Sequence, residues 1–242
     1  ADLGRVRLGI TGSASTPRKT AEKFKEVTGR ELHEILGMTE SGGVTAIDPA
    51  GQTATIGSVG FRLPYTTLSI RKRRDDGSLG AVCEPGEVGV LLVAGPSVSP
   101  GYRTPAPGAS PFVDGQLDTG DLAYRDDDGK LFIAGRAKDL IIRSGHNIDP
   151  ALIESAFLAH PEVGAAAAVG QPDAYAGELP ACYVVLVEDA SVTPDELLEF
   201  AKKRIGERPA WPKNVYALPT LPLTAVGKVY KPALRADAAR RV

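Results

Sequence analysis

The sequence predicts an α/β unit that leads into a β-rich region and then into a small α+β domain. A strand-like run, a helix and a second strand follow one another at the start of the chain. Short runs separated by glycine and proline then dominate from Thr53 to about Tyr102. After residue 137, apolar residues at helical spacing alternate with further strand-like runs.

Composition excludes several classes of protein. The chain has 242 residues, of which 43% are hydrophobic, which suits one large or two small domains with real cores. Its formal net charge of −2 provides no basic footprint for a nucleic acid or an anionic membrane. No apolar run approaches the roughly 20 residues that a membrane-spanning helix needs. We therefore expect no nucleic-acid partner and no transmembrane segment.

The cysteines indicate the redox compartment, and the first residues indicate how the chain begins. Cys83 and Cys182 have neither metal-ligand spacing nor a visible Cys/His arrangement, so we expect two buried free thiols in a reducing compartment, the cytoplasm. The run Ala1-Asp2-Leu3-Gly4-Arg5 has no initiator methionine and no apolar signal stretch. We interpret it as an internal start.

The first α/β unit is predicted from local signals. Polar and apolar residues alternate over Arg5–Thr11, which predicts a strand. The small-residue turn Gly12–Ser15 follows, and Thr16 is expected to cap a helix over 17–28 with proline at its first position. A second strand is expected over Glu31–Leu36.

Two segments lie at the carboxyl ends of these strands, where ligands of α/β sheets bind. They are Gly12-Ser13-Ala14 and Gly37-Met38-Thr39-Glu40. A threonine hydroxyl can donate to a phosphate oxygen, and a glutamate carboxylate suits Mg²⁺, a hard cation that prefers oxygen ligands. Taken alone, both segments also fit ordinary turns.

The β-rich stretch contains a basic cluster and a long loop. The clearest strands are Thr66–Arg71 and Val88–Val93. We interpret Arg71-Lys72-Arg73-Arg74, followed by Asp75-Asp76, as a solvated turn, because no aromatic residues are interleaved for nucleic-acid stacking. Pro96–Pro111 predicts an irregular loop, in which Gly101-Tyr102 is expected to be structural.

Charged and flexible residues concentrate between Asp118 and Ile148. A turn carrying Asp118 and Asp121 is expected before a hairpin around Asp128-Gly129. A carboxylate such as Asp121 can accept hydrogen bonds from the vicinal hydroxyls of a ribose. Gly135-Arg136-Ala137-Lys138-Asp139 then places two cations and a carboxylate beside a flexible glycine, and we infer a domain boundary there.

The last hundred residues predict two or three strands with three helices. Asp149 and Thr193 are candidate N-caps. The expected helices are 150–160, 194–205 and 230–239, and the expected strands are 163–169, 181–187 and 211–218. Lys228 lies in the loop after 219–227, where a lysine is most often a solvated surface charge.

Three motifs, in order along the chain, resemble the adenylate-forming (AMP-binding) superfamily, which includes acyl-CoA synthetases, luciferases and the adenylation domains of peptide synthetases. Gly37-Met38-Thr39-Glu40 is similar to its Tyr-Gly-Met-Thr-Glu motif. Asp118–Asp139 contains matches to its Thr-Gly-Asp and hinge motifs, and Pro222–Lys228 resembles its catalytic-lysine motif. The resemblance covers essentially the whole chain.

The resemblance implies a division of the chain. Residues 1–136 correspond to the distal, C-terminal part of the large AMP-binding domain, with its α/β unit and β-rich subdomain. Residues 137–242 correspond to a mobile α+β lid domain, with a hinge near 136–139 at Lys138. One departure is Leu36, which stands where the family has a tyrosine that stacks on adenine.

The resemblance also implies site residues. Gly12 and Ala14 line the adenine pocket, Thr39 contacts the α-phosphate, Glu40 binds Mg²⁺, and Asp121 holds the ribose. The full ATP/AMP-binding set is Gly12, Ala14, Gly37, Met38, Thr39, Asp121, Arg136 and Lys228.

Two groups of residues carry the implied chemistry. Lys228, Thr39 and Glu40 form the catalytic group. Ser144, Gly145 and His146 would line the path of CoA, although a lone histidine such as His146 is more often a hydrogen-bonded loop residue. His33 and His160 are interpreted as structural.

The implied activity is that of a fatty- or aryl-acid CoA ligase that uses ATP, Mg²⁺ and CoA and passes through an acyl-adenylate. The family's phosphate loop, which ends in Pro-Lys-Gly, occurs nowhere in this sequence. We therefore expect the C-terminal portion of a longer enzyme, inefficient alone. Two alternatives stay open: a degenerate or truncated nucleotide binder without turnover, and an adenylating enzyme that delivers to a carrier-protein thiol.

Overall fold

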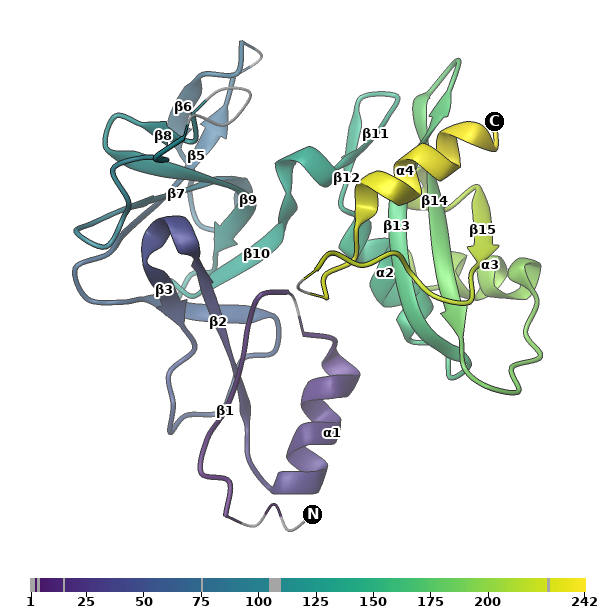
Figure 1. Ribbon diagram of the computed structural model, residues 1–242, viewed down its shortest axis with the longest axis horizontal. Coiled ribbons are helices and arrows are strands. Elements are labelled where there is room, and N and C mark those ends of the chain that lie inside the picture. The colour runs from purple at the N-terminus through teal and green to yellow at the C-terminus, as the bar shows by residue number, and fades with distance from the viewer. Residues whose placement is uncertain (1–2, 4, 15, 75, 105–109, 226) are drawn as a thin grey trace. The chain divides into compact units, whose positions relative to one another are not determined.

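The computed structural model describes residues 3, 5–14, 16–74, 76–104, 110–225 and 227–242. Ser15, Asp75, Val226 and residues 105–109 of the expected loop lie outside the described residues. The chain divides into two compact units, Ala1–Ala137 and Lys138–Val242, each with its own sheet and apolar core (Figure 1). Among the described helices, none has the length and apolar character to cross a membrane.

The first unit is built on a ten-stranded sheet in the order β1-β2-β3-β4-β10-β9-β7-β5-β6, with β8 paired to β9. Its one parallel pair is β1–β2, and α1 lies beside these two strands (Figure 1). The elements are β1 Gly9–Thr11, α1 Arg18–Thr28, β2 Leu32–Met38, β3 Gly43–Ile47, β4 Ser58–Arg62, β5 Thr67–Arg73, β6 Leu79–Val82, β7 Gly89–Ala94, β8 Phe112–Val113, β9 Gln116–Arg125 and β10 Leu131–Arg136. The predicted α/β unit followed by a β-rich region is confirmed.

The start of the α/β unit differs from the prediction in two details. The strand expected over 5–11 is confirmed only from Gly9 onward, because its partner β2 begins at Leu32, the residue opposite Gly9. Thr16 is not the helix cap. Pro17 holds that position, and the Thr16 hydroxyl donates to the Thr11 hydroxyl at 3.2 Å.

The expected turn at 118–121 is wrong, because these residues lie inside β9. The glycine signal is real, since Gly120 has a positive φ of 72°. It produces an irregularity in the ladder between β9 and β7, where the register shifts between Val90 and Leu92. Extra residues in one strand twist and bend it, so the segment stays in the sheet while its side chains are redirected.

The basic cluster is not a solvated turn either. Strand β5 continues to Arg73, so three of its four cations lie on a strand. Lys72 pairs with Glu87 at 2.8 Å, and Arg73 pairs with Asp118. Carboxylates from other segments therefore pair with two of these cations.

The second unit is a five-stranded sheet in the order β12-β11-β14-β13, with β15 parallel to β14. Its elements are β11 Ile141–Arg143, β12 His146–Ile148, α2 Pro150–Leu158, β13 Val163–Asp173, β14 Gly177–Leu186, α3 Pro194–Lys202, β15 Asn214–Ala217 and α4 Lys231–Arg240. The α+β class and the three helices are confirmed. The expectation of two or three strands is wrong, because β11 and β12 are too short to show a periodicity.

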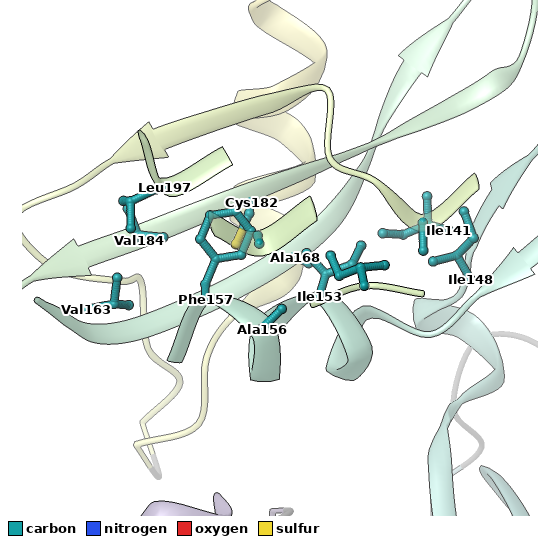
Figure 2. Close-up of a cluster of buried hydrophobic side chains, with 13 residues drawn as sticks. Ile141, Ile148, Ile153, Ala156, Phe157, Val163, Ala168, Cys182, Val184 and Leu197 are labelled. Atoms are coloured by element: carbon teal, nitrogen blue, oxygen red, sulfur yellow. The ribbon is translucent and has the colours of Figure 1, made fainter. Parts of the chain in front are cut away.

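Helices cover both faces of this sheet, as alternate residues of its two longest strands show. Ala168 and Cys182 face a cluster that includes Ile153 and Phe157 of α2 (Figure 2). Ala167 and Val169 face a second cluster with Leu234 and Ala238 of α4. Burial on both faces explains why these strands lack the polar alternation of a half-exposed sheet.

The two thiols and two of the histidines have structural surroundings. Both cysteines are free, but only Cys182 is fully buried, and its desolvation holds the pKa of its thiol well above the ordinary range. Cys83 is half-buried, so the expectation of two buried thiols is wrong for it. His33 lies 3.0 Å from the Asp48 carboxylate, and the ring of His160 accepts from the backbone N–H of Glu162.

The N-cap of α3 generates a testable prediction. The Thr193 hydroxyl accepts from the N–H of Glu196 at 3.3 Å, and the Glu196 carboxylate accepts from the N–H of Thr193 at 2.9 Å. We expect Thr193→Ala to lower the free energy of unfolding of the second unit by about 1 kcal/mol, because the N–H of Glu196 loses its acceptor and the Glu196 carboxylate loses the hydroxyl that donates to it. Urea unfolding followed by Trp211, the one tryptophan of the chain, measures this.

Thr220→Ala is the matched control, because Thr220 is exposed and has no side-chain hydrogen bond recorded within the described residues. An equal loss in both variants would contradict the capping role of Thr193.

Candidate functional site

A cavity of about 190 Å³ lies within the first unit, at the carboxyl ends of the parallel strands β1 and β2. The loop after β1, strand β2 itself, the start of β4 and the facing parts of β9 and β10 form its walls. The lining residues are Ser13, Ala14, Glu34, Ile35, Leu36, Gly37, Gly57, Val59, Asp121, Ile133, Gly135 and Arg136. The structure thus brings together four of the predicted nucleotide ligands, Ala14, Gly37, Asp121 and Arg136.

Asp121 and Arg136 form the charged part of this cavity. They stand directly opposite each other in the β9–β10 ladder, and the Arg136 Nε donates to Asp121 Oδ1 at 2.9 Å. A terminal nitrogen of the same guanidinium donates to the Thr119 carbonyl at 3.2 Å. Burial raises the pKa of Asp121, which is 8% exposed, and the Arg136 cation opposes this shift. The remaining carboxylate lone pairs and guanidinium donors are available to hydroxyl or phosphate groups.

The glycines of the two small-residue segments are required by packing. A Cβ at Gly12 would lie 2.6 Å from Ile35 Cγ1, and one at Gly37 would lie 2.1 Å from the Gly43 carbonyl oxygen. Gly37 also lines the cavity. Among the described residues, Gly12 is not one of the cavity's lining residues, so its predicted adenine contact gains no support from the geometry.

Thr39 and Glu40 follow β2 in the 3₁₀ helix Thr39–Ser41, beyond the residues that line the cavity. Thr39 is exposed and Glu40 is half-buried. Met38, the last residue of β2, is partly buried against the apolar core. Tyr102, which the sequence predicts to be structural, donates its hydroxyl to Glu40 Oε1 at 2.7 Å.

The residues near Glu40 fit a magnesium ion that is held mainly by a substrate. Within the part of the chain that the structure describes, no group of three or more His, Cys, Asp or Glu side chains could enclose a metal ion. Mg²⁺ is commonly bound by one or two carboxylates together with substrate phosphates and water. A single carboxylate such as Glu40 is therefore sufficient on the protein side.

Glu34 is a lining residue of the cavity that sequence reasoning missed. Its side chain, 7% exposed, accepts from the N–H of Gly57 at 3.2 Å and from the N–H of Thr16 at 3.4 Å. It thereby ties together the two loops that flank the cavity. The sequence did contain one sign of this role: Glu34 is the only carboxylate in β2, and the apolar pair Ile35-Leu36 follows it directly.

The predicted CoA residues lie on the second unit. Ser144 and Gly145 form the two-residue turn between β11 and β12, with φ values of 49° and 83°. His146 is the first residue of β12. All three residues are exposed, and a Cβ at Gly145 would meet no atom within 4 Å, so the turn presents an open backbone surface.

Lys228 also lies on the second unit, in the loop closed by the Leu223–Val229 bridge. The Thr224 N–H donates to the Lys228 carbonyl at 2.7 Å, and the Lys228 N–H donates to the Thr224 hydroxyl at 3.1 Å. The side chain is exposed, and no carboxylate among the described residues pairs with its ammonium group. These hydrogen bonds thus fix the backbone of Lys228, and its ammonium group remains available to a negatively charged ligand.

The predicted hinge lies at the division between the units, which falls between Ala137 and Lys138, one residue later than expected. Residues Ala137–Asp139 form a single 3₁₀ turn. Within the second unit, Arg235 of α4 donates to the Lys138 carbonyl at 3.2 Å and to the Asp139 carboxylate at 2.9 Å. Whether the chain turns here stays a prediction.

A pocket next to the carboxyl end of β1, with a buried carboxylate and a guanidinium among its lining residues, has the location at which α/β proteins commonly bind ligands. The family models agree. Residues 1–103 match the model of the AMP-binding enzyme, and residues 152–228 match that of the AMP-binding enzyme C-terminal domain. The chain belongs to the AMP-binding enzyme family.

Curated relatives with similar sequences are CoA ligases. The chain is 42% identical over 227 residues to a marinolic acid–CoA ligase of Pseudoalteromonas sp., covering 93% of this chain and 35% of the relative. It is 36% identical over 231 residues to a long-chain-fatty-acid–CoA ligase of Bacillus subtilis, covering 95% of this chain and 40% of the relative. The chain thus spans less than half the length of these relatives.

Solved structures confirm the predicted fold class. ATP-bound MatB from Rhodopseudomonas palustris superposes with a TM-score of 0.87 at 33% identity, covering 96% of this chain and 45% of that chain. The o-succinylbenzoate CoA synthetase MenE of Bacillus subtilis, in complex with its acyl-adenylate intermediate, gives a TM-score of 0.82 at 32% identity, covering 95% and 46%.

We predict that Glu34→Gln weakens AMP binding by about tenfold, because an amide retains one acceptor oxygen and meets the second N–H with a donor. Isothermal titration of the variant and the unaltered chain with AMP measures this. Glu31→Gln is the control, since Glu31 pairs with Lys25 on the same segment outside the cavity. Equal AMP affinities for Glu34→Gln and the unaltered chain would contradict the role.

The pH dependence of stability provides a second check on Glu34. Burial raises the pKa of Glu34 above its ordinary value of 4.5, against the N–H groups of Gly57 and Thr16, and Asp48 adds to the rise. A raised folded pKa means that the folded state binds the proton more tightly than the unfolded state does. The stabilisation is therefore complete below the ordinary value and is lost as pH rises through the raised one. Glu34→Gln should flatten this part of the stability profile.

Proposed function

We propose that this chain supplies the ribose-binding part and the lid domain of an AMP-forming acid–thiol ligase, an acyl-CoA synthetase. The observation that carries the proposal is the Asp121–Arg136 pair at the rim of the cavity. The carboxylate accepts the ribose hydroxyls of ATP, and the guanidinium donates to the ribose and phosphate region. Ala14, Gly37 and the aliphatic side chain of Leu36 provide the surface for the adenine.

The proposed reaction has two steps. A substrate carboxylate oxygen attacks the α-phosphorus of ATP, which forms an acyl-adenylate and releases pyrophosphate. The thiol of CoA then attacks the acyl carbon, which forms the thioester and releases AMP. Thr39 donates a hydrogen bond to the α-phosphate, and Glu40 holds Mg²⁺, which neutralises phosphate charge when bound.

Residues of the second unit serve the two steps in turn. The ammonium of Lys228 stabilises the charge that develops on the α-phosphate and on the attacking carboxylate. The open turn at Ser144, Gly145 and His146 lets the thiol arm of CoA pass in the second step. A rotation about Lys138 exchanges the two sets of residues, as lid and domain movements do in other enzymes.

The substrate class is a carboxylic acid, with fatty and aryl acids as the leading candidates. Relatives of similar identity are named for different acids, among them long-chain fatty acids, 2-succinylbenzoate and feruloyl groups. The incomplete coverage of the relatives favours one second candidate, a chain that binds nucleotide without turnover when alone. Delivery to a carrier-protein thiol and the cytoplasmic location stay predictions.

Asp121 provides the first test. We expect Asp121→Asn to weaken AMP binding by at least about tenfold, because the amide loses the charge and one acceptor site. Isothermal titration with AMP and with adenine measures the ribose contribution, and adenine binding should change little. Asp118→Asn is the control on the same strand, since Asp118 pairs with Arg73 outside the cavity. A similar loss in both variants would remove the ribose assignment.

Lys228 tests the chemistry. In the longer polypeptide that contains this chain, we expect pyrophosphate release with a subset of carboxylic acids and acyl-CoA as product when CoA is present. Lys228→Ala should slow acyl-adenylate formation by about a hundredfold or more, the scale of one lost charge-stabilising donor. Thioester formation from preformed acyl-adenylate should be largely retained.

Lys203→Ala, which removes another exposed lysine of the second unit, is the control. Unchanged adenylation in Lys228→Ala would refute the catalytic assignment. Nucleotide binding without pyrophosphate release from any acid would favour the non-catalytic candidate.

A further inference from the structure

The carboxylate of Glu40 is held by a residue from a distant loop. The Tyr102 hydroxyl donates to Glu40 Oε1 at 2.7 Å across 62 residues of sequence. The tyrosine ring itself is fixed, because it packs edge-on against Phe112 with 5.4 Å between the ring centroids. Among the described residues, no donor to the other oxygen, Oε2, is recorded.

The same loop also holds the backbone that carries Thr39 and Glu40. The N–H of Ser99 donates to the Glu40 carbonyl at 2.8 Å. Two residues further along, the backbone of Gly42 lies so close to Ser97 that a Cβ there would stand 2.9 Å from the Ser97 carbonyl oxygen. The 3₁₀ helix is therefore fastened at its backbone and at the side chain of Glu40.

We propose that Tyr102 is a positioning residue that fixes Glu40 through Oε1 and so leaves Oε2 as the single protein ligand for a nucleotide-bound magnesium ion. The proposal rests on the proposed function of this site. The terminal torsion of a glutamate side chain is broad, so a free carboxylate would have to be ordered when the metal binds. Mg²⁺ requires near-ideal octahedral geometry, which a carboxylate already held in place satisfies more readily.

The chemistry of the pair agrees with a permanent donor. A tyrosine hydroxyl ordinarily loses its proton only at about pH 10, so at neutral pH it can donate to the carboxylate at all times. The tyrosine is 47% exposed, so the loss of its hydroxyl should have little effect on folding. A metal response and a stability response are therefore separable by experiment.

The test is a double-mutant cycle of Tyr102→Phe and Glu40→Gln, with ATP binding measured by titration calorimetry in Mg²⁺ and in EDTA. We expect Tyr102→Phe to bind metal-free ATP as the unaltered protein does, and to lose about fivefold of the affinity that Mg²⁺ adds, the scale of one hydrogen bond to a carboxylate. In the Glu40→Gln background, Tyr102→Phe should have no further effect. Tyr65→Phe, at a tyrosine that is 84% exposed, is the matched control.

Three outcomes would overturn the proposal. One is a Mg²⁺ response of Tyr102→Phe equal to that of the unaltered protein. Another is a loss of the same size in the Glu40→Gln background, which would show that the tyrosine acts elsewhere. The third is ATP binding by the unaltered protein without any gain from Mg²⁺, which removes the metal role while the nucleotide site stands. No ATP binding at all would instead contradict the proposed function itself.

Discussion

The opposition of Asp121 and Arg136 across β9 and β10 is the contact on which the candidate site depends. Regular strands would direct successive side chains to alternate faces, but the ladder shifts register on both sides of Asp121. Burial alone would favour protonation of this carboxyl group, and the guanidinium opposes that shift. A charged acceptor is thus maintained in the wall of the cavity, opposite the residues that β2 and the loop after β1 contribute.

The elements that the sequence predicts well are those with strong local signals. Asp149 and Thr193 cap their helices as expected, because the side-chain oxygen of each accepts a hydrogen bond from an N–H of the first turn. The segment around Gly120 shows the limit of such signals. Its glycine does take a left-handed conformation, but pairing with neighbouring strands keeps the segment within β9. The three-residue strands β11 and β12 carry too few residues for any period to appear.

The residues of the candidate site also fall into those that the sequence reveals and those that it does not. Asp121, Arg136 and Gly37, which line one cavity, could be predicted as site residues because each lies in a short motif whose residue types are visible locally. Glu34 and Tyr102 were missed because they act through long-range partners: Glu34 accepts backbone N–H groups from two loops, and Tyr102 reaches a carboxylate on another element. Backbone donors have no residue signature, so contacts of this kind become visible only in three dimensions.

The hydrogen bonds from Arg235 to Lys138 and Asp139 restrict the backbone at the division between the two units. A linker of several residues without such contacts would allow the second unit many orientations. Here Lys138 and Asp139, the first residues after the division, are bound to α4 of their own unit. We therefore predict that any rotation at this division takes place in the backbone dihedrals before Lys138, and that the linker proper is as short as one or two residues.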